Sequence, residues 1–237
     1  MNKNITICVC TSRSVIPRES VVEVSRQLTK AGYTLHYEAD LCETAISSHQ
    51  AMREMAASVV IACYPRAVLA LFDRWALAPQ QVIDLRNHNG EEALRNFSLT
   101  TEPVSPQAFD PNRIDALPAH PGQDAWYPAI DKNRCCNCGK CHDFCLFGVY
   151  EMEEKTVKVG HPRNCKINCP ACARTCPQRA IIFPKYPKSP INGGLTNEEA
   201  MGLDAKTLYN EALRQRLAQR QAGVSLLRNK PSGKNPS

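Results

Sequence analysis

The sequence predicts an α/β domain with a small parallel sheet, followed by a smaller, cysteine-rich α+β domain and a C-terminal helix. Three observations support this prediction. Strand and helix patterns alternate over residues 1–97, prolines cluster over residues 98–130, and nine of the thirteen cysteines lie within residues 131–184. Alternating strands and helices are typical of a parallel sheet covered on both faces, whereas a dense group of cysteines indicates a small domain that depends on a metal.

In the first domain, short apolar runs predict strands, and the segments between them predict helices. Ile5, Ile7 and Val9 alternate in the first run, and Gly32 ends the helix that follows it. Asp40 and Glu43 have the spacing of a capping box at the start of the second helix. The expected strands are at residues 5–9, 33–37, 58–63 and 81–85, and the expected helices are at residues 17–30, from Asp40 onward, and at residues 65–75.

Prolines mark the boundaries between domains. Residues 98–130 contain six prolines with little periodicity, which predicts an extended linker over the surface. The cysteine-rich domain at residues 131–184 follows this linker. The last segment, residues 185–237, is expected to contain a hinge and a C-terminal helix from about Asn197 to Ala222, which either docks on a partner protein or packs on the α/β domain.

Composition indicates a protein that uses metal chemistry. No stretch approaches the roughly 18 to 20 apolar residues of a membrane span, and the apolar run at residues 4–10 is too short for a signal peptide. We therefore expect a cytoplasmic protein with no membrane span. Because the cytosol keeps thiols reduced, thirteen cysteines indicate metal ligands rather than disulfides. The net charge of +6 comes from the second half of the chain, and balancing anionic thiolate-ligated clusters accounts for much of this excess.

Eight cysteines form two similar runs, Cys135-x2-Cys138-x2-Cys141-x3-Cys145 and Cys165-x3-Cys169-x2-Cys172-x3-Cys176-Pro177. Three closely spaced cysteines on one loop can reach three corners of an iron–sulfur cubane, and the fourth ligand must come from elsewhere. In bacterial two-cluster ferredoxins the fourth ligand comes from the other run. We therefore expect cluster one on Cys135, Cys138, Cys141 and Cys176, and cluster two on Cys165, Cys169, Cys172 and Cys145.

A pair of zinc sites is the alternative, but zinc sites usually take two cysteine pairs rather than a triplet and a distant single cysteine. Residues 130–184 resemble the two-[4Fe-4S] ferredoxin family, including a hairpin around Glu153-Glu154-Lys155. The resemblance implies an α+β ferredoxin-like two-cluster domain with two [4Fe-4S] clusters. Two features depart from the family: Leu146 replaces the proline common after the first run, and the second run opens with three intervening residues. Cys136 is expected to be a bystander thiol.

The first domain contributes four further cysteines. Cys8 and Cys10 close the first strand, Cys42 follows the second, and Cys63 closes the third. Because the carboxyl ends of parallel strands meet at one edge, and helix N-termini there favour an anionic group, we expect a third [4Fe-4S] cluster at this edge. The alternative is that these cysteines are small buried apolar side chains. The Cys-x5-Arg loop of phosphatases is absent, since Arg13 follows Cys8 by five residues and Cys10 by three.

The segments Ile-Cys-Val-Cys at residues 7–10, Leu-Cys at 41–42 and Ala-Cys-Tyr-Pro-Arg at 62–66 resemble the N-terminal domain of the HdrA component of heterodisulfide reductase, over about residues 4–97. The resemblance implies an iron–sulfur cluster on these same four cysteines. That family continues into a flavin domain. This chain has no Gly-x-Gly-x-x-Gly motif and no P-loop, so neither flavin nor nicotinamide is expected in it.

These features predict an iron–sulfur electron-transfer protein or subunit that relays single electrons between a donor and a partner oxidoreductase, rather than a stand-alone enzyme. The expected partners are redox proteins such as heterodisulfide-reductase-like or flavoprotein subunits. One alternative is an iron–sulfur redox sensor or nucleic-acid-associated regulatory factor; however, the basic second half lacks a nucleic-acid module, so no nucleic acid is expected. Another alternative is an enzyme whose Cys8 and Cys10 edge holds a labile, Lewis-acidic cluster.

Overall fold

The computed structural model describes residues 4–13, 15–86, 109–118 and 124–195. The expected C-terminal helix and much of the proline-rich segment lie outside these residues. Within the described ranges, no helix combines the length and the apolar character that crossing a membrane requires.

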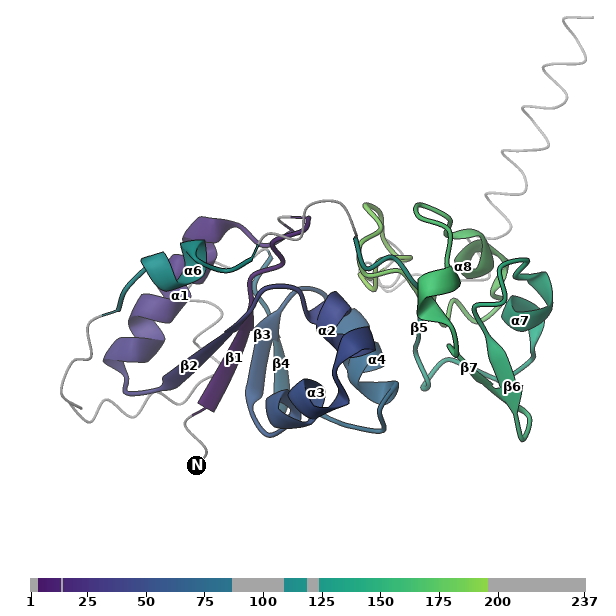
Figure 1. Ribbon diagram of the computed structural model, residues 1–237, viewed down its shortest axis with the longest axis horizontal. Coiled ribbons are helices and arrows are strands. Elements are labelled where there is room, and N and C mark those ends of the chain that lie inside the picture. Colours follow the sequence, from purple (N-terminus) through teal and green to yellow (C-terminus); the bar gives the residue numbers. More distant parts are fainter. Residues whose placement is uncertain (1–3, 14, 87–108, 119–123, 196–237) are drawn as a thin grey trace, which may run out of the picture. The chain divides into compact units, whose positions relative to one another are not determined.

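The first domain contains a four-stranded sheet in which every neighbouring pair is parallel, with the strand order β2-β1-β3-β4 (Figure 1). This arrangement confirms the predicted α/β domain. In the central pairing, Ile5 lies opposite Leu35 on one side and Val59 on the other. The strands are β1 (Asn4–Cys8), β2 (Thr34–Glu38), β3 (Val59–Ala62) and β4 (Gln81–Asp84).

Helices cover both faces of this sheet (Figure 1). On one face, Ile5 and Ile7 of β1 belong to an apolar cluster with Val21 and Val24 of α1 (Arg18–Lys30). On the other face, Cys8 belongs to a second cluster with residues of the remaining helices. This division follows from the alternation of side chains along a strand. The helices of the second face are α2 (Leu41–Ser47), α3 (His49–Ala56) and α4 (Pro65–Asp73).

The second helix differs from its prediction in two ways. Asp40 caps α2 by accepting from the backbone N–H groups of Cys42 and Glu43, as the spacing predicts. In a full capping box, the Asp40 N–H would also donate to the Glu43 side chain. Here the Asp40 N–H donates to Glu38 instead, and the Glu43 carboxylate pairs with Arg163 of the cysteine-rich domain. The helical segment that begins after Asp40 is also interrupted, since Ser48 caps a separate helix, α3, by accepting from Ala51 N–H.

The proline-rich segment is not an extended surface linker in its described part. Residues 112–115 form a short helix, α6 (Asn112–Asp115), whose Ile114 is buried against the α1 side of the sheet. Farther along, Tyr127 is 2% exposed, and β5 (Ala129–Ile130) pairs with a strand of the cysteine-rich domain. The two domains consequently belong to one compact unit that ends at Gly194.

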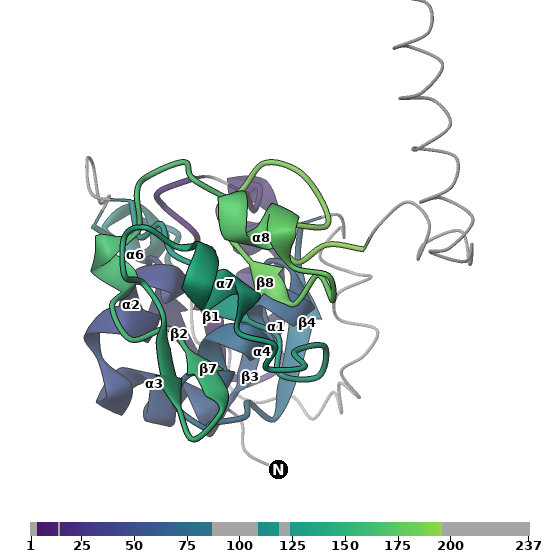
Figure 2. The ribbon, with the colours of Figure 1, turned by 90° about the vertical axis from the view of Figure 1, so that its right-hand side faces the viewer.

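The cysteine-rich domain consists of short elements connected by tight turns (Figure 2). A β-hairpin stands where the sequence predicts it, with Glu154 and Lys155 in the left-handed conformation at its turn. Each cysteine run contains a five-residue helix, and these two helices contact each other. The elements are α7 (Lys140–Phe144), β6 (Glu151–Glu153), β7 (Thr156–Lys158), a 3₁₀ turn (Pro162–Asn164), α8 (Ala171–Thr175) and β8 (Ile181–Ile182), which pairs antiparallel with β5.

Candidate metal centres

The first group of thiols combines the first run with the last cysteine of the second. Burial, and then the charge of Cys176, raises the pKa of Cys135. Burial also raises the pKa of Cys141 to about 12, with further contributions from the charges of Cys135 and Cys176. Cys138 is exposed, and its charge contributes to the raised pKa of Cys135. Each of these shifts thus includes the charge of another member of the set expected for cluster one.

The second group combines the second run with Cys145. Burial, and then the charges of Cys172, Cys169 and Cys145, raises the pKa of Cys165 to about 12. Burial raises the pKa of Cys172 to about 11, and the charge of Cys145 contributes in the same direction. The Tyr150 hydroxyl donates a hydrogen bond of 3.0 Å to Cys172 Sγ. The charges of the set expected for cluster two thus contribute to the pKa shifts of its own members.

An asparagine in the left-handed conformation stands immediately before the second ligand position of each run. Asn137 has φ 53° and precedes Cys138, and Asn168 has φ 61° and precedes Cys169. Asparagine tolerates this conformation better than other residues with a side chain, because its short amide bonds locally. The turn before Cys169 shows that the extra residue in the second run leaves this local conformation intact.

The third group consists of the four N-terminal cysteines. Cys8, Cys10 and Cys42 are 5%, 7% and 7% exposed. Burial, followed by the charges of Cys10 and Cys63, raises the pKa of Cys8. Burial raises the pKa of Cys63 to about 12, and the charge of Cys10 adds to this shift. Cys42 lies in the first turn of α2, and its pKa is raised by burial and by the charges of Asp40, Cys63 and Cys10. The structure thus brings four thiols from three separate segments to one place.

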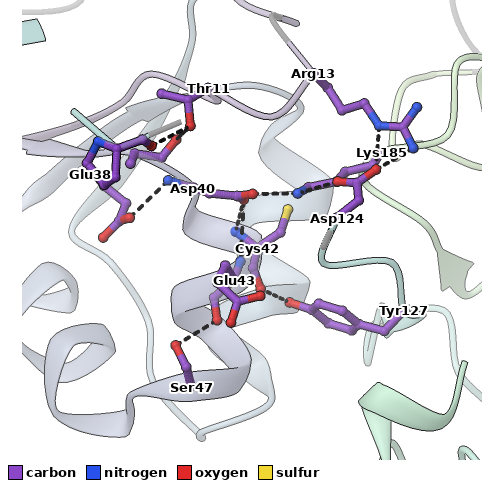
Figure 3. Close-up of polar contacts among 12 residues, drawn as sticks. Thr11, Arg13, Glu38, Asp40, Cys42, Glu43, Ser47, Asp124, Tyr127 and Lys185 are labelled. Atoms are coloured by element: carbon purple, nitrogen blue, oxygen red, sulfur yellow. Dashed lines mark hydrogen bonds and ion pairs between the residues drawn. The ribbon is translucent and has the colours of Figure 1, made fainter. Parts of the chain in front are cut away.

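A buried lysine stands beside the third group (Figure 3). The side chain of Lys185 is 2% exposed, and its Nζ lies 2.5 Å from Asp40 Oδ2 and 2.7 Å from Asp124 Oδ1. Burial lowers its pKa, but the charge of Cys42 and the two aspartates outweigh burial, so the net shift is upward. The Asp40 carboxylate also accepts from the Cys42 N–H at 3.1 Å. Sequence reasoning missed Lys185, because 145 residues separate it from Asp40.

Several contacts join the second and third groups. Cys165 packs against the apolar cluster that contains Cys8, Cys10 and Cys42. The Tyr127 hydroxyl donates to the Cys42 carbonyl at 2.6 Å (Figure 3). The first and second groups are coupled in turn, since the charge of Cys172 contributes to the raised pKa of Cys141. Members of the second group thus interact with members of both other groups.

The candidate ligands in the three groups are all cysteine thiols. Thiolates are soft ligands that select iron–sulfur clusters, copper(I) and zinc. With Zn–S bonds near 2.3 Å, tetrahedral zinc would require sulfurs about 3.8 Å apart, closer than the corners of a cubane. Among the described residues, no three His, Cys, Asp or Glu side chains are arranged to hold a metal ion. Cys136 is exposed.

Comparison with known proteins supports the same chemistry. No family model matches the chain. It is 52% identical over 61 residues to an uncharacterized ferredoxin of Methanocaldococcus jannaschii, covering 25% of this chain and 42% of that protein. It is 35% identical over 79 residues to Ferredoxin-3 of Nostoc, covering 24% of this chain and 80% of that protein. A second uncharacterized M. jannaschii ferredoxin is 30% identical over 56 residues, which make up 73% of its length.

The chain thus spans less than half of the first of these relatives and most of the other two. The resemblance of the N-terminal domain to the HdrA component of heterodisulfide reductase stays a prediction. Over about a quarter of its length, the chain belongs to the ferredoxin family.

Proposed function

We propose that this chain is an iron–sulfur electron-transfer protein or subunit in which three groups of four cysteines each hold a [4Fe-4S] cluster. Membership of the ferredoxin family supports the iron–sulfur electron-carrier role. The observation that carries the rest is that Cys8, Cys10 and Cys42 lie in one apolar cluster, against which Cys63 and also Cys165 of the cysteine-rich domain pack. Iron–sulfur clusters supply one-electron transfer over a wide range of potentials.

The ferredoxin domain would hold two clusters with crossed ligands. Cys176 couples to the first run, and Cys145 couples to the second, as this arrangement requires. The protein also supplies hydrogen bonds to sulfur. The Ala180 N–H donates to Cys176 Sγ at 3.3 Å, and Tyr150 donates to Cys172. Donors of this kind stabilise negative charge on the thiolates and are among the means by which proteins set cluster potentials.

The third cluster would be held by Cys8, Cys10, Cys42 and Cys63. Cysteines that acted only as small apolar side chains would need no charge beside them. Here the Lys185 ammonium, which pairs with Asp40 and Asp124, is buried next to Cys42. Three of the four thiols are buried, so this centre would exchange electrons through the ferredoxin domain rather than directly with solvent-borne partners.

The proposed relay runs from the N-terminal centre through cluster two to cluster one. Cys165 lies against the N-terminal apolar cluster, and Cys141 and Cys172 lie at the junction of the other two groups. Cys138 is exposed, which makes cluster one accessible to a redox partner. We infer a partner of the heterodisulfide-reductase-like or flavoprotein class, and a cytoplasmic location.

Iron and acid-labile sulfide in the anaerobically purified chain test the cluster number. Three clusters require about 12 Fe per chain and two require about 8. The double variant Cys42→Ala/Cys63→Ala should lose about 4 Fe while the spectroscopic signals of the ferredoxin domain persist. Cys136→Ala, which removes the one thiol outside the three groups, is the matched control and should keep all the iron. An unchanged iron content in the double variant would show that the N-terminal cysteines are apolar core residues and not cluster ligands.

Electron paramagnetic resonance of single variants tests the crossed ligands. Cys176→Ser and Cys138→Ser should perturb the same signal, because their thiols belong to the first group. Cys172→Ser should perturb the other signal. A common signal for Cys176 and Cys172 would show that each run completes its own cluster and that the crossed assignment is wrong.

A further inference from the structure

Tyr150 is a buried side chain that packs with cysteines of two different groups. It stands between the first run and β6, and it is 4% exposed. The apolar cluster to which it belongs also contains Cys141 of the first group and Cys172 of the second. Burial, and then the charge of Cys172, raises the pKa of Tyr150, and the charge of Cys141 contributes less. The ring of Tyr150 is therefore packed in the core that the two cysteine runs share.

The hydroxyl of this side chain makes a specific contact with the second group. Tyr150 Oη lies 3.0 Å from Cys172 Sγ, and the hydroxyl is the donor. Burial is the larger effect on Cys172 and raises its pKa, while the bond from Tyr150 lowers it. This is the direction expected when a hydroxyl donates to a thiolate. A thiolate that binds iron keeps lone pairs on its sulfur, so it can still accept this bond.

A hydrogen bond to a ligand sulfur favours the reduced form of a cluster. Reduction adds one negative charge, part of which the ligand sulfurs carry, and a donor stabilises that charge. The bond from Tyr150 is buried, and a hydrogen bond is electrostatically stronger inside a protein than in water. The bond to Cys176 differs in kind, because the Ala180 donor is a backbone N–H. The donor on Tyr150 can be removed by a substitution that leaves the backbone unchanged.

We propose that Tyr150 raises the potential of cluster two through its hydrogen bond to Cys172 and leaves the potential of cluster one unchanged. Tyr150 acts through the ligand and takes up no electron itself. By raising one of the two potentials, it would set the driving force for electron transfer between the clusters of the ferredoxin domain. The inference rests on the proposed function, because it requires a cluster bound to Cys172.

Redox titration of the anaerobically purified full chain, followed by electron paramagnetic resonance, tests the proposal. The Cys138→Ser and Cys172→Ser chains assign the two signals. Tyr150→Phe keeps the ring and removes the hydroxyl. The equilibrium constant for reduction of cluster two should fall about tenfold, which is about 59 mV for one electron, while that of cluster one stays unchanged.

Tyr186→Phe is the matched control. Its ring packs against the same apolar cluster, but its hydroxyl accepts from Arg174 at 3.2 Å. Removing this hydroxyl should leave both potentials unchanged. A shift of cluster two in Tyr186→Phe as large as that in Tyr150→Phe would overturn the specific role of Tyr150.

Iron content separates failure of this inference from failure of the proposed function. Fewer than about 8 Fe in the natural chain would contradict the two clusters of the ferredoxin domain, and this inference with them. At equal iron content, an unchanged potential of cluster two in Tyr150→Phe would overturn the role of Tyr150 alone. Equal shifts of both clusters would do the same.

A second variant decides the matter if Tyr150→Phe does not hold cluster two. Fluorotyrosine, introduced in place of Tyr150 by amber suppression, keeps the shape of tyrosine. The fluorine makes the hydroxyl more acidic and therefore a stronger donor. The potential of cluster two should then rise above that of the natural chain, and an unchanged or lower potential would overturn the proposal.

Discussion

The ferredoxin domain and the N-terminal domain assemble their cysteines in different ways. In the ferredoxin domain, two runs with left-handed asparagines place three thiols each by local turns; Cys138 is exposed, and most of the other thiols are only partly buried. In the N-terminal domain, four thiols converge from a strand end, a helix start and a second strand end, and most are buried. A centre built by local turns needs little support from distant residues, whereas a centre built by packing depends on that support.

Charge compensation differs in the same way. In the ferredoxin domain, the backbone N–H of Lys140, only two residues away, is the main cause of the lowered pKa of Cys138. Beside the N-terminal cysteines, the buried cation is Lys185, which reaches Asp40 and Asp124 from beyond β8. The N-terminal centre should therefore be the more sensitive of the two to substitutions far away in the sequence.

The largest expected contrast is in thiol reactivity after removal of metal. Burial raises the pKa of Cys63 from an ordinary value near 9 to about 12, while the pKa of Cys138 is lowered. At pH 8 the thiolate fraction of Cys63 should therefore be about a thousandfold below that of an ordinary cysteine. Mass spectrometry of chelator-treated protein during iodoacetamide alkylation should find Cys138 modified long before Cys63. Equal alkylation rates at Cys138 and Cys63 would contradict the proposed difference in burial between the two sites.

The same shift has a consequence for stability in the metal-free protein. Because the folded-state pKa of Cys63 lies above its unfolded value, the neutral thiol stabilises the fold below about pH 9, and this contribution is lost as the pH rises from about 9 to 12. The apparent Tm of the chelator-treated chain should fall over that range. A Cys63→Ala chain should show a smaller fall, and an identical pH dependence in both would contradict the assignment.

Lys185→Met should be the most damaging change outside the cysteines. It leaves the carboxylates of Asp40 and Asp124 without their buried cation, and breaking such a pair costs about 3–5 kcal/mol. We expect a lower apparent Tm in thermal unfolding and preferential loss of the N-terminal iron. Lys188→Met, at an exposed lysine three residues away, is the control and should behave as the natural chain. A small effect at Lys185 would show that the two centres do not differ in their need for distant support.

Substitution of the left-handed asparagines should have an intermediate effect. Asn168→Val places a β-branched residue at φ 61°, which costs about 1–2 kcal/mol, and should lower the occupancy of cluster two more than that of cluster one. Asn168→Gly keeps the turn without strain and is the control. Iron content and the two paramagnetic signals measure the outcome. Loss of both clusters to the same extent would show that the runs do not fold independently.

The smallest effect should come from the exposed ion pair that joins the two domains. Arg163 pairs with Glu43 of α2, and the arginine side chain is 56% exposed. Pairs of this kind contribute about 0–1 kcal/mol and are screened by salt. Arg163→Gln should therefore change the apparent Tm only slightly, and less at about 1 M salt, where the Debye length is about 3 Å, than at about 0.01 M salt, where it is about 30 Å. A large decrease in the apparent Tm that did not depend on salt would show that this pair stabilises the fold as a buried ion pair does.

Sequence reasoning succeeded where the information is local. The alternation of Ile5 and Ile7 predicted a strand, Asp40 predicted a helix start, and the hairpin at Glu153-Glu154-Lys155 was also predicted correctly. The strand and the helix start depend on periodicity or on a hydrogen bond between residues a few positions apart, and the hairpin follows from the resemblance to the ferredoxin family. The spacing of the eight cysteines likewise determines which thiols a single loop can bring close together. The break at Ser48 was missed, because a serine can cap a helix or lie within one until packing decides.

Tertiary structure decided what depends on residues far apart in the chain. The proline-rich segment was expected to be exposed, but Ile114 and Tyr127 have apolar surface that the two domains bury. The ion pairs of Lys185 and the contact of Tyr150 with Cys172 likewise had no signal in the sequence. By itself, the sequence determined the cysteine spacing, the strand and helix pattern and the ferredoxin chemistry, since these depend on neighbours along the chain. The surroundings of the N-terminal cysteines depend on segments more than a hundred residues apart, and only folding brings those segments into contact.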